Sequence, residues 1–161
     1  MDEFAAKVLS RLQNRCARVE CCSSDIRKKA EAALAEAADE TIVEEIMESL
    51  QREGYVDDLR YASAFAREKA SLTGWGPVKI RFALAAKRIP DEIIRQALEE
   101  LDGSASDKRL RSLLAAKWKN LTGPDGQVPP DAKLKLLKYA LGRGYEYDVV
   151  RHVVESVIND G

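Results

Sequence analysis

Histidine is almost missing from this chain, and its scarcity excludes much of the chemistry that proteins build on imidazole. His152 is the only histidine, and the three cysteines, Cys16, Cys21 and Cys22, are odd in number with two of them adjacent. This pattern fits neither a zinc-ligand spacing nor a disulfide framework, and no HExxH, CxxC or GxSxG motif occurs. We therefore expect no catalytic residue, no metal site and no cofactor, and we expect reduced, partly buried thiols.

Long apolar runs are also missing. No stretch approaches the roughly 18 uninterrupted apolar residues of a membrane-spanning helix. The first residues, MDEFAAKVLSRL, are acidic and then amphipathic, unlike a secretory signal peptide. The sequence therefore predicts a cytoplasmic protein with no membrane partner.

Aromatic residues make up only 6% of the 161 residues, whereas charged residues reach 33% and hydrophobic residues 45%. Ala, Leu, Glu, Lys and Arg are abundant, and these residue types favour helices over sheets. A chain of this length and hydrophobic content can bury a core, either as one domain or as a short array of repeats. We predict an all-α protein.

The net charge of −1 hides a gradient along the chain. Residues 1–50 hold 7 basic and 11 acidic residues, and residues 104–161 hold 10 basic and 7 acidic residues. Such a balance does not attract the phosphate backbone of nucleic acid in bulk. Any contact with nucleic acid would therefore depend on the local placement of Lys and Arg side chains.

Three segments of the chain repeat one apolar pattern: ETIVEEIMESL (40–50), DEIIRQALEEL (91–101) and YDVVRHVVESV (147–157). Aligned without gaps, they match in five apolar columns: Ile42/Ile93/Val149, Val43/Ile94/Val150, Ile46/Ala97/Val153, Met47/Leu98/Val154 and Leu50/Leu101/Val157. The spacing i, i+1, i+4, i+5, i+8 places these columns on one face of a helix. Each such helix needs neighbours to cover its apolar face.

A second helix is predicted before each of these segments, because residues 78–87 align with residues 134–143 and the first copy starts near Ser23. A third helix is predicted in the first two copies from the match of residues 57–70 to residues 107–120. The alignment also gives two recurring basic positions: Lys79/Lys135 and Lys87/Arg143.

The predicted fold is therefore all-α, an elongated, curved array of tandem three-helix repeats in which neighbours cover each other's apolar faces. The segment TGPDGQVPP is the one clear linker, because its Gly and Pro residues cannot continue a helix. The predicted organisation is an N-terminal helix (1–20), repeat 1 (21–73), repeat 2 (74–122), a linker (123–130) and a third repeat of two helices (131–161).

The GWG triplet at 74–76 invites comparison with a phosphate-binding loop. Neither GxGxxG nor GxxxxGK[ST] is completed, and no strand is expected before the triplet. Gly76 as an N-cap and Pro77 as the first helical residue explain the same letters as a turn into a helix. The adjacent Asp57 and Asp58 are likewise expected to cap a helix rather than to form a catalytic pair.

Seven basic residues on the predicted helices are candidates for binding a partner or DNA: Lys79, Arg81, Lys87, Arg88, Lys135, Lys138 and Arg143. Repetition at equivalent positions would place positive charge at regular intervals along one face of the array. A solvated helix face with no partner explains the same charges, and this alternative stays open. Trp75 and Trp118 could stack on bases between these charges, although each also fits a core or turn-packing role.

Two stretches match one family pattern in order. GYVDDLRYASAF (54–65) follows the pattern Gly, aromatic, aliphatic, Asp, acidic, any residue, Arg, aromatic, Ala. GPVKIRFALAAKRIPDEIIRQAL (76–98) follows the pattern Gly-x-x-x-Ile-x-x-x-Leu-x-x-basic-x-Ile. Over about residues 16–158 the chain resembles the RecX family of recombinase regulators, and its CARVECCSSDIRKKA opening looks like a subgroup typical of Bacteroidetes-like bacteria.

The resemblance implies tandem three-helix repeats, no catalysis, and the RecA recombinase filament on single-stranded DNA as the partner. It implies that the chain lodges in the filament groove and limits filament growth, ATP hydrolysis, strand exchange and co-protease action in DNA repair, recombination and the SOS response. Some members of the family also touch DNA directly, so single-stranded DNA is an open second partner, and we expect a monomer. The alternatives are a sequence-independent DNA-binding helical module and a helical adaptor with an unrelated protein partner.

One position departs from the family pattern. Arg88 stands where members usually have glycine, just before the isoleucine of the turn, whereas its counterpart Gly144 keeps the glycine. If that turn needs a positive φ, Arg88 costs about 1 kcal/mol of backbone strain.

Overall fold

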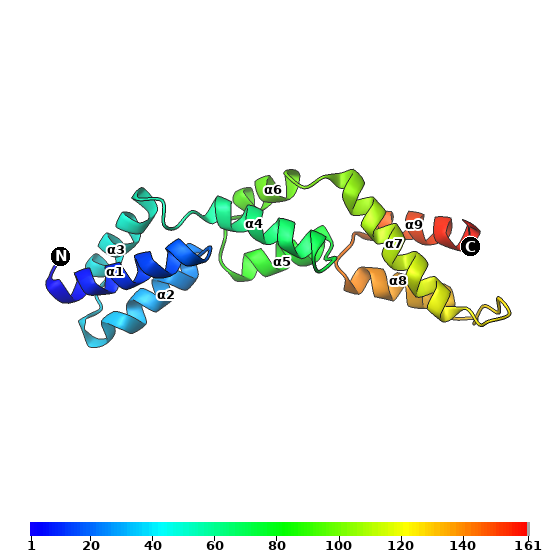
Figure 1. Cartoon of the computed structure of the whole chain (residues 1–161), viewed down its shortest axis with the longest axis horizontal. Helices are drawn as coiled ribbons and strands as arrows, with labels where there is room; N and C mark the ends of the chain where they lie inside the picture. The colour runs from blue at the N-terminus through cyan, green and yellow to red at the C-terminus, as the bar shows by residue number, and fades with distance from the viewer. Residues whose placement is uncertain (161) are drawn as a thin grey trace. The chain divides into compact units, whose positions relative to one another are not determined.

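The chain folds into nine α-helices and one short 3-10 helix, with no strand, in a computed structural model that describes residues 1–160 (Figure 1). The elements are α1 (Glu3–Arg18), α2 (Ser23–Leu34), η1 (Ala35–Ala37), α3 (Glu40–Arg52), α4 (Asp58–Ser71), α5 (Pro77–Ala86), α6 (Asp91–Glu99), α7 (Gly103–Leu121), α8 (Ala132–Gly142) and α9 (Tyr147–Asp160). The prediction of an all-α fold is confirmed, and none of the helices over residues 1–160 is long and apolar enough to span a membrane.

Short acidic side chains begin several helices. Asp2, Asp39 and Asp57 accept hydrogen bonds from the backbone N–H three residues ahead, at 2.8, 2.9 and 3.0 Å. Each such cap stabilises a helix by about 1 kcal/mol because it satisfies a backbone donor that the helix leaves open. Asp57 therefore caps α4 as expected, and Pro77 is the first residue of α5, as its fixed φ favours.

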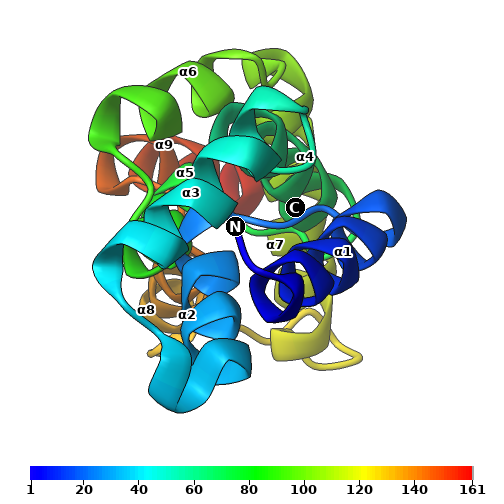
Figure 2. The same ribbon diagram turned by 90° about the vertical axis from the view of Figure 1, so that its left-hand side faces the viewer.

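One compact unit of the chain comprises Met1–Ala64 and Leu84–Ala97. In this unit α1 packs against α2 and α3, and α2 packs against α3, as Figures 1 and 2 show. The buried side chains between these helices include Val8, Leu12, Ile26, Leu34, Ile46 and Leu50. The hydrophobic faces that the sequence predicts are therefore covered by neighbouring helices.

The three cysteines of this unit are buried free thiols. Burial raises the pKa of the Cys16 thiol to about 12, and a hydrogen bond with Cys21 acts in the same direction. Burial also raises the pKa of the Cys22 thiol. Such thiols stay protonated at neutral pH and are poor nucleophiles.

The other compact unit comprises Phe65–Ala83 and Leu98–Gly161. Here α7 packs against α8 and α9, and α8 packs against α9 (Figure 1). The buried side chains between these three helices include Leu110, Leu114, Leu136, Val150, Val154 and Val157. This unit holds most of the candidate basic residues.

Two glycines allow a close backbone approach in this second unit, where the start of α5 meets the residues after α8. The N–H of Gly76 donates to the carbonyl of Arg143 at 2.8 Å, and the N–H of Val78 donates to the carbonyl of Gly144 at 2.9 Å. A Cβ on Gly76 would overlap the Gly144 carbonyl, and a Cβ on Gly144 would lie 2.7 Å from the Lys79 nitrogen. Only glycine fits at both positions, and Gly144 also has a φ of +95°.

The repeated apolar columns are buried in a consistent way across α3, α6 and α9. The second and third columns are buried in all three copies: Val43, Ile94, Val150, Ile46, Ala97 and Val153. The first column is half-buried in all three copies: Ile42, Ile93 and Val149. The alignment therefore identified equivalent helices.

The helices can be divided into three-helix repeats at more than one starting helix. The packed groups α1–α3 and α7–α9 begin one helix earlier in the period than the predicted repeats, which start at α2, α5 and α8. A periodic series can be divided at any point of its period, so the predicted boundaries stay a prediction. Between α7 and α8, residues 122–131 are described and are not helical.

Candidate partner-binding residues

Lys79 and Arg81 lie on α5 and differ in their surroundings. The Nζ of Lys79 lies 4.7 Å from the centre of the Trp75 ring, and the Nζ of Lys69 on α4 lies 4.8 Å from it. Phe65 meets the same ring edge-on, with 6.3 Å between ring centres. Trp75 thus gains a role that the sequence left open, because its ring attracts two ammonium groups. The side chain of Arg81 is exposed and makes no hydrogen bond or ion pair within residues 1–160.

Lys87 follows α5 and is partly committed to internal contacts. Its Nζ donates to Oδ2 of Asp25 at 2.9 Å, and its carbonyl accepts a 2.5 Å hydrogen bond from the hydroxyl of Ser24. The hydrogen bond from Lys87 lowers the pKa of the Asp25 carboxyl, and the same bond raises the pKa of Lys87. Lys87 therefore ties the turn after α5 to the first turn of α2.

Arg88 adopts the backbone conformation that the family pattern suggests. Its φ is +60°, in the left-handed region, as is the φ of Gly144 at +95°. The side chain is exposed, makes no hydrogen bond or ion pair with any described residue, and lines a pocket of about 430 Å³ beside Arg27 and Lys28. Glycine is replaced here without a change of turn, so the strain of about 1 kcal/mol applies.

The other three candidates belong to α8 and the turn after it. Lys135 lies 3.4 Å from the Asp131 carboxylate in an exposed pair one turn apart, which is worth little in water. Lys138 is exposed and unpaired within the described part of the chain. Arg143 is half-buried, and its Nη2 donates to the carbonyl of Thr73.

Lys87 and Arg143, which the alignment made equivalent, make equivalent contacts. Lys87 follows α5 and Arg143 follows α8. The Lys87 carbonyl accepts a bond from the start of α2, and the Arg143 carbonyl accepts one from the start of α5. The two side chains also donate to earlier parts of the chain, Lys87 to Asp25 and Arg143 to the Thr73 carbonyl. The repetition that predicted a partner-binding face therefore also has a structural cause. The charge of Lys87 is paired with Asp25 inside the fold, whereas Arg143 donates to a neutral carbonyl and keeps its charge.

The structure brings some of the candidates together and separates others. Lys79 and Arg143 flank the same backbone contact between α5 and the turn after α8, in the second unit. Lys87 and Arg88 belong to the first unit. The sequence did not single out Lys69, which lies over the rings of Phe65 and Trp75, or Arg109, which lies near Tyr145 on a distant part of the chain.

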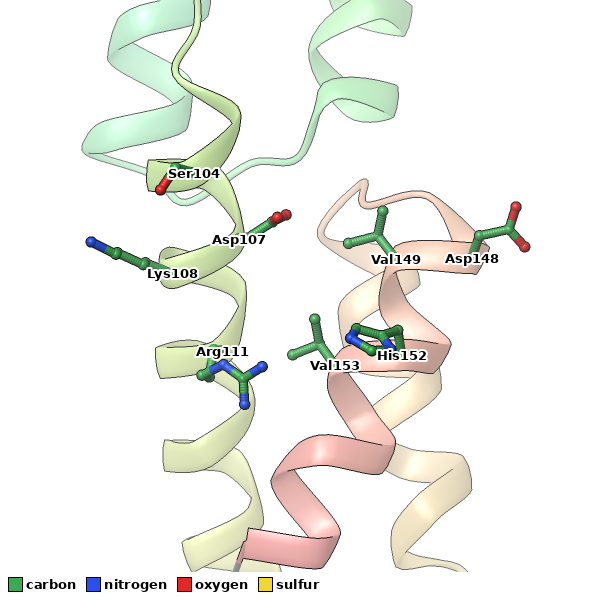
Figure 3. Close-up of a pocket in the computed structure, with 8 residues that line it drawn as sticks. All are labelled: Ser104, Asp107, Lys108, Arg111, Asp148, Val149, His152 and Val153. Atoms are coloured by element: carbon green, nitrogen blue, oxygen red, sulfur yellow. The ribbon is translucent and has the colours of Figure 1, made fainter.

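A surface pocket of about 580 Å³ lies between α7 and α9 (Figure 3). Its polar lining carries both signs of charge: Asp107, Lys108, Arg111, Asp148 and His152. Arg111 is already engaged, since it donates to the Ser156 hydroxyl at 2.6 Å and lies 3.8 Å from the Asp160 carboxylate. Figure 3 shows Asp148 directed away from α7 and Lys108 directed away from α9. This mixture selects neither a cation nor an anion.

Metal-ligating side chains do not gather in the part of the chain that the structure describes. No group of three or more His, Cys, Asp or Glu residues within 1–160 could hold a metal ion.

Comparisons with known proteins find similar sequences. A family model described as "RecX, second three-helix domain" matches residues 57–98, which include α4, α5 and all of α6 but its last residue. The "Regulatory protein RecX" of Chromohalobacter salexigens is 34% identical over 110 residues, which are 68% of this chain and 67% of that protein. The protein of the same name from Clostridium acetobutylicum is 29% identical over 123 residues, 75% of this chain, and the chain spans only 56% of its length.

Solved structures are similar in fold. The crystal structure of RecX from Lactobacillus salivarius has a TM-score of 0.83 and 16% identity, with 98% of each chain covered. A further crystal structure, titled as that of regulatory protein RecX, has a TM-score of 0.78 and 23% identity, with 95% of this chain and 72% of that chain covered. At these identities the likeness concerns the helical fold.

Proposed function

The chain belongs to the RecX family, and on this basis we propose that it is a non-enzymatic regulator of a RecA-type recombinase. The proposal rests on the 34% identity over 110 residues to the regulatory protein of Chromohalobacter salexigens. In this role the chain binds the recombinase filament on single-stranded DNA and restrains its ATP hydrolysis, strand exchange and co-protease action. It thereby acts in DNA repair and recombination.

The exposed basic residues are the side chains best placed to meet the filament. The side chains of Arg81, Arg88 and Lys138 are exposed and make no hydrogen bond or ion pair within residues 1–160. Lys135 is engaged only by a weak exposed pair, and Lys87 is paired with Asp25. Lys79 and Arg143 have no carboxylate partner within residues 1–160, so their charges are open to a partner. Such charges speed association with an acidic protein surface and help to select it.

Direct DNA binding is the runner-up. Basic residues on a helical module suit the phosphate backbone, but the net charge of −1 gives no general attraction to a polyanion. A protein partner therefore accounts better for a few exposed cations on a nearly neutral chain.

The test compares two targets at equal concentration. The chain, labelled at its N-terminus, is titrated with recombinase filament assembled on a thymidine oligonucleotide and, separately, with the bare oligonucleotide, while fluorescence anisotropy is measured. We expect binding to the filament and little binding to the bare strand. Equal binding to both with a steep salt dependence would favour the DNA-binding module, and binding to neither would favour an unrelated partner.

A triple variant, Arg81→Gln with Arg88→Gln and Lys138→Gln, tests whether these three exposed cations contribute to filament binding. If each cation contributes about 0.5 kcal/mol at the interface, filament binding should weaken roughly tenfold. The matched control removes three exposed basic residues whose side chains also make no hydrogen bond or ion pair within residues 1–160: Arg11→Gln, Lys29→Gln and Arg95→Gln. Equal affinities for the two triple variants would remove the three candidates from the interface.

A further inference from the structure

A second pocket, of about 440 Å³, opens beside α7 within the second unit. Its walls come from the end of α4 and the turn that follows, from α7, and from the residue after α8. The lining holds three cationic side chains, Lys108, Arg109 and Arg143, and two leucines, Leu72 and Leu113. No acidic side chain lines it.

Two arginine Nε–H groups of this pocket lack acceptors. The Nε atoms of Arg109 and Arg143 are buried, and they are the only buried side-chain nitrogen or oxygen atoms of residues 1–160 without a hydrogen-bond partner. Neither arginine lies within ion-pair distance of a described carboxylate. A buried donor that is left unpaired costs about 1–3 kcal/mol, and more when it is charged. Each guanidinium group is therefore charged with no carboxylate beside it, and an anion bound at its other N–H groups would offset that charge.

Neutral groups hold the two guanidinium groups in place. Arg143 donates to the Thr73 carbonyl, and the Tyr145 hydroxyl donates to the Gly74 carbonyl at 3.1 Å. Burial raises the pKa of Tyr145, while the nearby positive charges of Arg109 and Arg143 oppose that rise. None of these contacts involves a carboxylate, so the two positive charges and that of Lys108 stay uncompensated.

The apolar side chains of the pocket decide which anion fits. Leu72 is 81% exposed, and Leu113 is half-buried in the same lining. A carboxylate next to an aliphatic side chain would satisfy the arginines and cover the leucines together. A nucleic-acid phosphate is flanked by polar sugars and would leave the leucines in water.

We propose that this pocket binds an acidic side chain of a protein segment, with the aliphatic neighbour of that side chain packed on Leu72 and Leu113. The two guanidinium groups bind the carboxylate, and Lys108 adds charge at the rim. The proposal depends only on the residues of the pocket, so it does not rest on the proposed recombinase regulation.

The experiment observes the orphan donors directly by ¹⁵N NMR of the full chain at low salt. The probe is the peptide acetyl-Gly-Leu-Asp-Leu-Gly-amide, and its matched control has Asn in place of Asp. We expect the Asp peptide to shift the Nε–H signals of Arg109 and Arg143 and the amides of Gly74 and Leu113. The Asn peptide should bind at least about tenfold more weakly, because it lacks the charge.

Other outcomes overturn the proposal. Equal binding of the two peptides would show that charge is not selected. Shifts of the same signals by inorganic phosphate or a thymidine oligonucleotide, with none by the Asp peptide, would assign the pocket to nucleic acid. The absence of shifts with all probes would mean that the pocket binds none of these ligands.

Variants separate binding from folding. Arg109→Gln should weaken binding of the Asp peptide about tenfold or more, and Arg109→Lys should restore part of it, since the charge returns without the fork of donors. The control Arg151→Gln, an exposed residue of α9, should bind as the parent does. If Arg109→Gln has an unaltered amide spectrum and binds with parental affinity, the proposal is wrong.

Discussion

Substitution of Gly144 by Ala should destabilise the second unit strongly. The residue has a φ of +95°, and an added Cβ would overlap the side chain of Lys79 and lie 2.7 Å from its backbone nitrogen. The left-handed backbone costs alanine about 1–2 kcal/mol. Relief of the overlap requires the start of α5 to move away.

The movement breaks two hydrogen bonds, from Gly76 to the Arg143 carbonyl and from Val78 to the Gly144 carbonyl. At about 1 kcal/mol each, their loss brings the total to about 3–4 kcal/mol. For a chain of this size the melting temperature should fall by roughly 10 °C. Urea unfolding followed by tryptophan fluorescence measures the change, since Trp75 directly precedes Gly76.

Gly142→Ala is the matched control two residues away. Gly142 is the last residue of α8, and a Cβ there meets nothing within 4 Å. Alanine in a helix should be neutral or stabilising by up to about 1 kcal/mol. A Gly144→Ala variant as stable as the Gly142→Ala variant would refute the argument that the backbone contact requires glycine.

Three other substitutions or conditions probe the first unit. Asp58→Ala removes the hydrogen bonds of 2.8 and 2.5 Å from the N–H and hydroxyl of Ser23. Urea unfolding should show a free energy of unfolding that is lower by about 1–2 kcal/mol. A decrease below about 0.5 kcal/mol would contradict this role. Because the pKa of Asp25 is lowered from 3.8 by its hydrogen bond with Lys87, the pair stabilises the fold above that value and its contribution is lost as the pH falls through the lowered pKa. The difference in stability between the parent and Asp25→Asn, below about 1 kcal/mol for a pair this exposed, should therefore vanish in acid, and a difference that is constant with pH would count against the pair. Since the pKa of the Cys16 thiol is about 12, iodoacetamide at neutral pH should alkylate it only after unfolding in urea, as mass spectrometry can measure, and rapid labelling of the folded chain would contradict its burial.

The apolar periodicity was enough to predict the fold. A helix buries residues spaced by i, i+1, i+4 and i+5, so the columns of Val43 and Ile46 and their equivalents show burial without any tertiary information. The helix starts could be read in the same way, because Asp57 and Pro77 act within their own turn. Both are local features of the chain.

The contacts between distant segments could not be read from the sequence. Asp58 is adjacent to a cap and looks like one, yet its carboxylate bonds to Ser23, which lies 35 residues earlier. Arg109 becomes notable only because Tyr145 is folded against it. Gly76 could be assigned to an N-cap, but its need to be glycine comes from Gly144.

For the candidate basic residues, too, the sequence predicted some features and only the structure shows others. The alignment found Lys87 and Arg143 as equivalents, and the structure adds that the side chains of both contact an earlier copy of the repeat. Periodic charge in a repeat protein can therefore reflect a repeated internal contact as well as a repeated external one. Exposure without a partner separates Arg81, Arg88 and Lys138 from these two.

The ATPase activity of a recombinase filament tests the central claim most directly. Filament is assembled on single-stranded DNA, and the rate of ATP hydrolysis is followed while the chain is added from sub-stoichiometric to equimolar amounts. A regulator that binds along the filament should lower the rate progressively over this range. A rate that stays unchanged up to equimolar chain would contradict the proposed function.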